Sequence, residues 1–182
     1  DRCIINQREV FQDSKSFQLA LKAVFREDAN VVLVGEMRDL DTIGTALTAA
    51  ETGHLILATL HTNDSAQTID RIVDVFPSHQ QNQVRSQLAN VLLAVVSQRL
   101  VPKIEGGRTP AVEIMIKNHA VENLIRENKS YQIDNVIETS TDQGMITMDR
   151  SLASLVKQGI VSVDSAMAYA KDPKNFEALL KF

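Results

Sequence analysis

Two mainly apolar runs in the first third of the chain predict buried strands. They are residues 31–35 and the segment HLILATL at 54–60. Between them, DTIGTALTAAETG has the spacing of an amphipathic helix, with Asp41 as its N-cap and Gly53 just past its end. A strand, a helix and a strand in this order, with strands that are apolar throughout, are typical of a parallel sheet covered on both faces.

Helical spacing continues on both sides of this segment. SKSFQLALKAVFRED predicts a helix that starts at Ser14 or Ser16. Four apolar residues share one face of that helix: Phe17, Leu21, Val24 and Phe25. SAQTIDRIVDVF predicts a further helix that ends before Pro77, and QNQVRSQLANVLLAVVSQRL at 81–100 predicts one long helix.

The last part of the chain has a different pattern. Gly106 and Gly107, between LVPKI and AVEIMI, predict a β-hairpin. Beyond residue 117 the chain consists of short amphipathic stretches separated by Asn, Ser, Gly or Pro, which predict a set of short helices. We therefore expect an α/β part over residues 1–117 and a small all-helical region over residues 118–182.

Composition excludes several classes of protein. A net charge of -4 over 182 residues argues against a dedicated nucleic-acid surface, which usually shows as a basic excess. The single cysteine, Cys3, excludes a disulfide framework and a Cys-rich zinc site. No apolar run has the length needed to cross a bilayer. The chain begins with DRCIINQREV and lacks an initiator Met, so we expect it to be part of a longer protein.

Glu36 follows the first apolar run almost directly. In open α/β sheets ligands bind beyond the carboxyl ends of the strands. An acid there can hold a magnesium-bound water or orient the water that attacks a phosphoryl group. The alternative is an ion pair with Arg38 or Arg71 that only ends the strand. Because an acid after a buried strand is unfavourable unless it is used or paired, the pattern favours a functional role.

His61 follows the second apolar run, so parallel neighbouring strands would place it on the same edge as Glu36. An imidazole there can donate to a phosphate oxygen and report its presence. His54 begins the same run, roughly 23 Å from His61 in a fully extended chain. A structural role for His54 therefore stays open, and the separation argues against a metal site formed by His54, His61 and Asp64.

The stretch REDANVVLVGEMRDLDTIGTALTAAETGHLILATLHTNDSAQTIDRIVDVFP resembles the Walker B and His-box region of the type II/type IV secretion ATPases. These are RecA-like motors of secretion systems and pilus machines, and the resemblance is greatest to the members that retract type IV pili. It implies an α/β fold with a RecA-like parallel-sheet core, here lacking the Walker A half, followed by a helical region. In this family Glu36 corresponds to the Walker B glutamate, and His54 and His61 to the His-box residues.

The chain departs from the family pattern at two places. Ala29 and Asn30 stand where Pro-Asp usually precedes the Walker B strand, which alters a turn and leaves the chemistry at the strand end intact. AVENLIREN corresponds to the family motif AIRNLIRE. The resemblance implies that this motif forms a contact needed for retraction. The motif residues that the chain retains are Ala120, Leu124, Ile125, Arg126 and Glu127. Glu122 replaces a basic residue, and ordinary packing of this helix is the alternative interpretation.

The segment after SQRL favours a retraction-type motor. Assembly and secretion members of the family commonly insert a four-cysteine zinc module there, whereas this chain has a short Gly-Gly turn without cysteine. A zinc knuckle cannot form without its thiolates. The resemblance therefore implies retraction of type IV pili, with pilus assembly or type II secretion as the alternative.

No G-x-x-x-x-G-K-[ST] phosphate-binding loop occurs in the sequence. The resemblance places Walker A, and an acidic Asp box with another catalytic glutamate, before Asp1. We therefore expect the chain alone not to hydrolyse ATP at a useful rate and not to hold ATP and Mg²⁺ as the intact protein would. The intact protein is expected to be a cytoplasmic ATPase, peripheral at the inner membrane. It would form a homo-oligomer, a hexamer, and act on the pilus platform proteins in twitching motility.

Arg8 and Arg2 lie in a segment that, in members of this family, is near the nucleotide and the subunit contacts. An arginine finger there would stabilise the charge that builds up in phosphoryl transfer. The alternative is a surface ion pair with Glu9 or Asp13. For the whole chain, two other hypotheses are a non-catalytic helical interaction module and a metal-dependent hydrolase.

Overall fold

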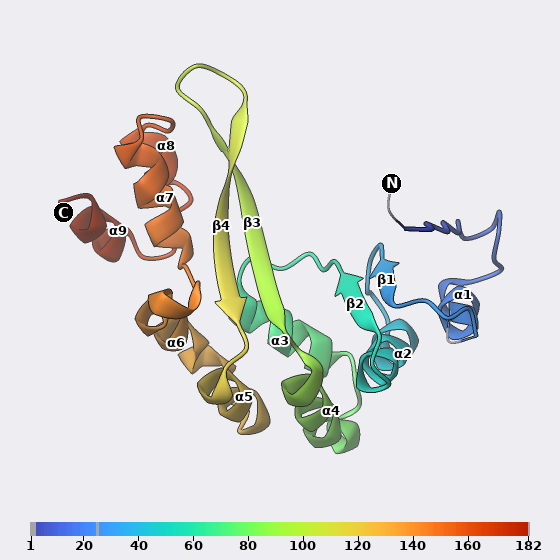
Figure 1. Cartoon of the computed structure of the whole chain (residues 1–182). Coiled ribbons are helices and arrows are strands. Elements are labelled where there is room, and N and C mark those ends of the chain that lie inside the picture. Colours follow the sequence, from blue (N-terminus) through green and yellow to red (C-terminus); the bar gives the residue numbers. More distant parts are fainter. Residues whose placement is uncertain (1–2, 25, 182) are drawn as a thin grey trace. The chain divides into compact units, whose positions relative to one another are not determined.

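The computed structural model describes residues 3–24 and 26–181, whose helices and strands are labelled in Figure 1. These residues fall into two units. The first comprises Asp1–His61 and Ile72–Val91, and the second comprises Thr62–Arg71 and Leu92–Phe182. These units differ from the predicted domains over 1–117 and 118–182, because the hairpin before residue 117 packs with the C-terminal helices. The predicted domain division stays a prediction.

The first unit contains a strand–helix–strand arrangement flanked by two more helices. Its elements are α1 (Phe17–Val24), β1 (Val31–Val34), α2 (Leu40–Glu51), β2 (Leu55–Ala58) and α4 (Ser78–Val91). β1 and β2 are parallel neighbours, with Val31 opposite Leu55 and Val34 opposite Ala58. The predicted parallel pairing of the two apolar runs is therefore confirmed.

The prediction that both faces of this sheet are covered is wrong for the described residues. Val34 is 1% exposed and packs with Leu21 of α1 and Ala46 of α2. On the opposite face Leu33 is 72% exposed, and Leu57 is also exposed. Successive residues of a strand point to opposite faces, and in this unit α1 and α2 contribute to a core on one face alone.

The ends of α2 show which local signals decide a helix boundary. Asp39, and not the predicted Asp41, is the N-cap, because its Oδ1 accepts a hydrogen bond from the Thr42 amide at 2.9 Å. Asp41 lies in the first turn, where a negative charge suits the helix dipole. Gly53 follows the helix with a φ of +100°, a conformation that favours glycine, as predicted.

The start of α1 agrees with one of the two predicted caps. Ser16 Oγ accepts a hydrogen bond from the Leu19 amide at 3.2 Å, whereas Ser14 Oγ donates to the Ser16 carbonyl at 2.9 Å. Ser16 is therefore the cap. Phe25, predicted on the apolar face, lies outside the described residues.

The prediction of one helix over 81–100 is wrong beyond Val91, where α4 ends and β3 (Ala94–Pro102) begins. β3 pairs antiparallel with β4 (Arg108–Ile116) along nine residues. Burial alternates along β3: Val95 is buried and Val96 exposed. The β-branched residues fit this pleated surface, and the partner strand overrides the helical pattern. The Gly106–Gly107 turn, with both φ angles positive, confirms the predicted hairpin.

The second unit packs short helices against this hairpin (Figure 1). Its helices are the start of α3 (Ser65–Asp74), then α5 (His119–Arg126), α6 (Ile133–Thr139), α7 (Met148–Lys157), α8 (Val163–Met167) and α9 (Pro173–Leu180). Two 3₁₀ turns lie at Ser130–Gln132 and Thr141–Gln143. Leu152 and Phe176 are fully buried and pack with Val101 of β3 and Ala111 of β4. The predicted series of short amphipathic helices is confirmed. Within the described ranges no helix has the length and apolar character required to cross a membrane.

Candidate functional site

Glu36 and His61 lie together at the carboxyl ends of β1 and β2. His61 Nε2 is 3.1 Å from Glu36 Oε1. Two hydrogen bonds between the segments that follow the strands hold them side by side: the Met37 amide donates to the Thr59 carbonyl at 3.1 Å, and Thr59 Oγ1 donates to the Gly35 carbonyl. The expectation that the acid and the imidazole share one edge of the sheet is met.

Arg38 also contacts this carboxylate, with its Nε 2.5 Å from Glu36 Oε1. The pairing with Arg38 that the sequence left open is thus present alongside the His61 contact. The Arg38 hydrogen bond holds the pKa of Glu36 below its ordinary value, and His61 acts in the same direction. Glu36 is therefore ionised near neutral pH, which suits it to orient a water or a cation, and its lowered pKa makes it a weak base.

Exposure shows that this group of three side chains can change partners. Glu36 is 26% exposed, whereas the side chains of Arg38 and His61 are 76% and 84% exposed. Ion pairs between exposed side chains are screened by water and hold their partners loosely. An incoming anion or hydrated cation can therefore reach Glu36 and His61 without the opening of a core.

His54 lies at the other end of β2, directly before Leu55. Its Nδ1 is 3.1 Å from the Ala49 carbonyl and 3.2 Å from Thr52 Oγ1, so it contacts the last turn of α2. These contacts support the structural role that the spacing left open. Its assignment to the site stays a prediction.

The other predicted site residues lie in separate places. Arg8 pairs with Glu27, so it forms a surface ion pair with a partner other than the expected Glu9 or Asp13. Arg2 lies outside the described residues. Asp64 caps α3 by accepting from the Gln67 amide at 2.8 Å. Within residues 3–24 and 26–181 no three His, Cys, Asp or Glu residues group as metal ligands.

The predicted retraction motif forms α5, and its residues divide between core and surface. Val121 and Ile125 are buried and Leu124 is partly buried, in agreement with the alternative of ordinary packing, and the retraction role stays a prediction. Arg126 is exposed, and its guanidinium lies 2.5 Å from Glu122 Oε1. The acid at the departing position therefore pairs with a motif arginine one turn away on the same helix. Glu127 pairs with Lys129 at 2.7 Å.

Sequence reasoning missed Glu113, a carboxylate that is 1% exposed in β4. Its Oε1 accepts hydrogen bonds from the amide and the hydroxyl of Ser65, both at 2.8 Å. Burial raises the pKa of Glu113, while the Ser65 hydrogen bonds oppose that shift. Its position in AVEIMI, in phase with the buried Ala111 and Met115, was a signal that could have identified it.

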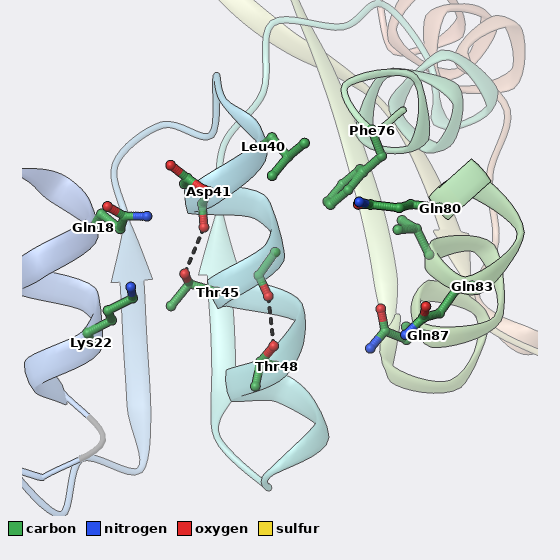
Figure 2. A pocket seen from close by; sticks show the side chains of 12 residues that line it. Gln18, Lys22, Leu40, Asp41, Thr45, Thr48, Phe76, Gln80, Gln83 and Gln87 are labelled. Atoms are coloured by element: carbon green, nitrogen blue, oxygen red, sulfur yellow. Dashed lines mark hydrogen bonds between the residues drawn. The ribbon is translucent and has the colours of Figure 1, made fainter. Parts of the chain in front are cut away.

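A depression of about 460 Å³ lies elsewhere in the first unit (Figure 2). Glutamines of α1 and α4 line it together with the threonines of α2. The Thr45 and Thr48 hydroxyls donate to the carbonyls of Asp41 and Gly44 one turn earlier, at 2.7 and 2.9 Å. Neither Glu36 nor His61 lines it, so the depression is distinct from the edge that carries them.

Comparison with known families places this edge in context. Residues 5–106, more than half of the chain, match the family model described as "Type II/IV secretion system protein". The chain belongs to this family. The type II/IV secretion family match includes both strands, α2, Glu36 and His61, and ends inside the β3–β4 turn.

Two relatives match nearly the whole of the chain. The "Type IV pilus retractation ATPase PilT" of Pseudomonas aeruginosa is 52% identical over 175 residues, 96% of this chain and 51% of the relative. A "Twitching motility protein" of Neisseria gonorrhoeae is 53% identical over 96% of this chain and 47% of the relative. The chain therefore spans about half the length of these relatives.

A solved structure confirms the fold class. "Crystal Structure of the Pilus Retraction Motor PilT and Bound ADP" matches with a TM-score of 0.87 and 52% sequence identity, over 96% of this chain and 49% of that one. The predicted RecA-like α/β core with a following helical region is thus the architecture of the chain.

Proposed function

We propose that this chain is part of a motor ATPase that couples ATP hydrolysis to the retraction of type IV pili. The observation that carries the proposal is the pairing of Glu36 and His61 at the carboxyl edge of two parallel strands. Similarity to the PilT relatives over 96% of the chain supports retraction as the task. Pilus assembly or type II secretion is the alternative, and the short hairpin turn without cysteine argues against it.

ATP with Mg²⁺ is the implied substrate, and the residues of this edge fit part of that role. A carboxylate suits a hydrated Mg²⁺, and an imidazole suits a phosphate oxygen. In the proposed function Glu36 would orient water or hold a magnesium-bound water, and His61 would contact the terminal phosphate. The lowered pKa of Glu36 makes its carboxylate a weaker base, which favours orientation of water over proton abstraction. The backbone amides of a phosphate-binding loop would come from a part of the protein outside this sequence.

The remaining predicted residues take secondary roles in the proposal. His54 would support the start of β2, and Arg8 would exchange its Glu27 partner for a nucleotide or a neighbouring subunit. α5 would present its exposed motif residues to the retraction machinery while Val121 and Ile125 anchor it. The intact protein would be a cytoplasmic hexamer, peripheral at the inner membrane and bound to the pilus platform proteins.

The test is steady-state ATP hydrolysis by the full-length protein carrying Glu36→Gln. The substitution keeps the size of the side chain and removes its charge. Loss of a group that acts on the reacting phosphate lowers kcat by about 10²–10³-fold, with a much smaller change in KM. Glu51→Gln is the matched control, because Glu51 is an exposed acid of the same unit that accepts a hydrogen bond from Gln87, and it should retain wild-type kcat.

Wild-type kcat in the Glu36→Gln protein would contradict a role for this carboxylate in hydrolysis. The phenotype of cells that lack the gene distinguishes a retraction motor from an assembly motor. Loss of retraction with surface pili retained is expected for a retraction motor, whereas loss of the pili themselves would favour the assembly alternative.

A further inference from the structure

His61 lies on a short span of chain that is fastened at both ends. At the near end, Thr59 is bonded through its carbonyl and its hydroxyl to Met37 and Gly35, which follow β1. At the far end, Asp64 and Ser65 begin α3. The segment between these anchors holds only residues 60–63, which reach at most about 18 Å from anchor to anchor. His61 therefore lies on a short stretch of chain between the two anchors.

Glu113 fixes the first residue of α3. Both hydrogen bonds from Ser65, one from its amide and one from its hydroxyl, end on Glu113 Oε1 at 2.8 Å. Ser65 is 0% exposed, so water does not compete for these donors. A carboxylate at the amino end of a helix also suits the helix dipole. The anchor is therefore stiff, and it belongs to a strand 48 residues further along the chain.

Lys171, whose side chain is 42% exposed, pairs with Asp64, the largely buried acid before Ser65. Its Nζ lies 3.3 Å from Asp64 Oδ2 and 2.7 Å from Asp134 Oδ2. The loop that carries Lys171 is itself held, because the Lys171 amide donates to Oδ1 of the buried Asp149 at 2.7 Å. The ammonium group therefore joins the start of α3 to α6 and, through its own backbone, to α7.

We propose that Glu113 and Lys171 are positioning residues for His61, which hold the start of α3 and so link the imidazole to the helices of the second unit. The inference rests on the proposed function, in which His61 contacts the terminal phosphate. A change at the nucleotide would pull on residues 60–63 and be passed to β4, α6 and α7 through these two side chains. In the reverse direction, a load on the helices would shift His61 and alter the rate of hydrolysis.

The test is a double-mutant cycle in the full-length protein with Lys171→Met and His61→Ala. Lys171→Met keeps the apolar stem and removes the ammonium. If Lys171 acts through His61, the substitution lowers kcat about tenfold in the wild-type background, with KM nearly unchanged, and less than about twofold when His61 is already Ala. Lys171→Arg, which keeps the charge, should restore most of kcat.

Lys174→Met is the matched control, because Lys174 is an exposed lysine three residues further along the chain in the same unit. It should leave kcat unchanged in both backgrounds. An equal loss of kcat from Lys171→Met in both backgrounds would show a general structural effect and overturn the inference, as would no loss in either.

Hydrogen exchange of the peptide that covers residues 59–66 gives a second readout, independent of hydrolysis. Exchange should rise in Lys171→Met and stay at the wild-type level in Lys174→Met. A wild-type protein without ATPase activity would overturn the proposed function, and exchange would then decide whether Lys171 fastens this segment. Active wild-type protein combined with unchanged exchange in Lys171→Met would overturn the positioning role alone.

Discussion

Replacement of Glu113 by alanine should loosen the start of α3 by an amount that follows from its contacts. The substitution removes the acceptor of two hydrogen bonds from Ser65, whose amide and hydroxyl are buried. Hydrogen bonds to charged groups contribute about 1.5–3 kcal/mol each, and a buried donor without an acceptor is unfavourable by a similar amount. The loss of a buried carboxylate offsets part of this effect, because burial raises its pKa. We expect a net loss of about 2–4 kcal/mol in the free energy of local opening.

The assay is amide hydrogen exchange of the full-length protein over residues 62–71. A loss of 2–4 kcal/mol corresponds to exchange that is faster by about 30- to 1000-fold. Glu113→Gln is the control, since its amide oxygen can still accept both bonds, and it should speed exchange by less than about tenfold. Equal rates in wild type and Glu113→Ala, or equal acceleration in both variants, would refute the reasoning.

Three further predictions concern stability. Because burial raises the pKa of Glu113 above 4.5, its contribution to the free energy of unfolding is fully present below pH 4.5 and is lost as the pH rises through the raised value. In urea unfolding, wild type should therefore lose stability relative to Glu113→Gln above pH 4.5, by at most about 1.4 kcal/mol per pH unit. A difference in stability that does not change with pH would contradict this. Asp39→Ala removes the N-cap of α2 and should lower stability by about 1 kcal/mol at pH 7, whereas Asp39→Asn, which keeps an acceptor, should lower it less. Phe176→Ala should lower stability by about 3–5 kcal/mol and speed protease cleavage within 171–181, and wild-type resistance would show that α9 is held by other contacts.

The strand–helix–strand order and the shared edge could be predicted because they depend on local patterns. Two apolar runs separated by one helix leave parallel pairing as the simplest way to bury them, and parallel pairing brings their carboxyl ends together. The positions of Glu36 and His61 follow from this geometry alone. The contact of Arg38 with the same oxygen was an open alternative, since a residue two positions along the chain can reach the carboxylate or solvent.

Three features could not be predicted because partners far away in the sequence decide them. Residues 94–100 carry a pattern compatible with a helix or a strand, and nine residues of pairing with β4 decide for the strand. Apolar runs indicate that strands are buried but do not identify the covering segment, so the exposure of Leu33 was not foreseen. The role of Glu113 depends on Ser65, 48 residues earlier. Asp39 and Asp41 were ambiguous for a local reason, since both acids precede the same helical pattern.

The most direct test of the account is a structure of the full-length protein with a non-hydrolysable ATP analogue and Mg²⁺. The proposed roles of the two residues predict that His61 Nε2 lies within about 3 Å of a terminal phosphate oxygen, and that Glu36 reaches the attacking water or a magnesium-bound water. A terminal phosphate remote from the edge formed by β1 and β2, with Glu36 still paired only to Arg38, would contradict it.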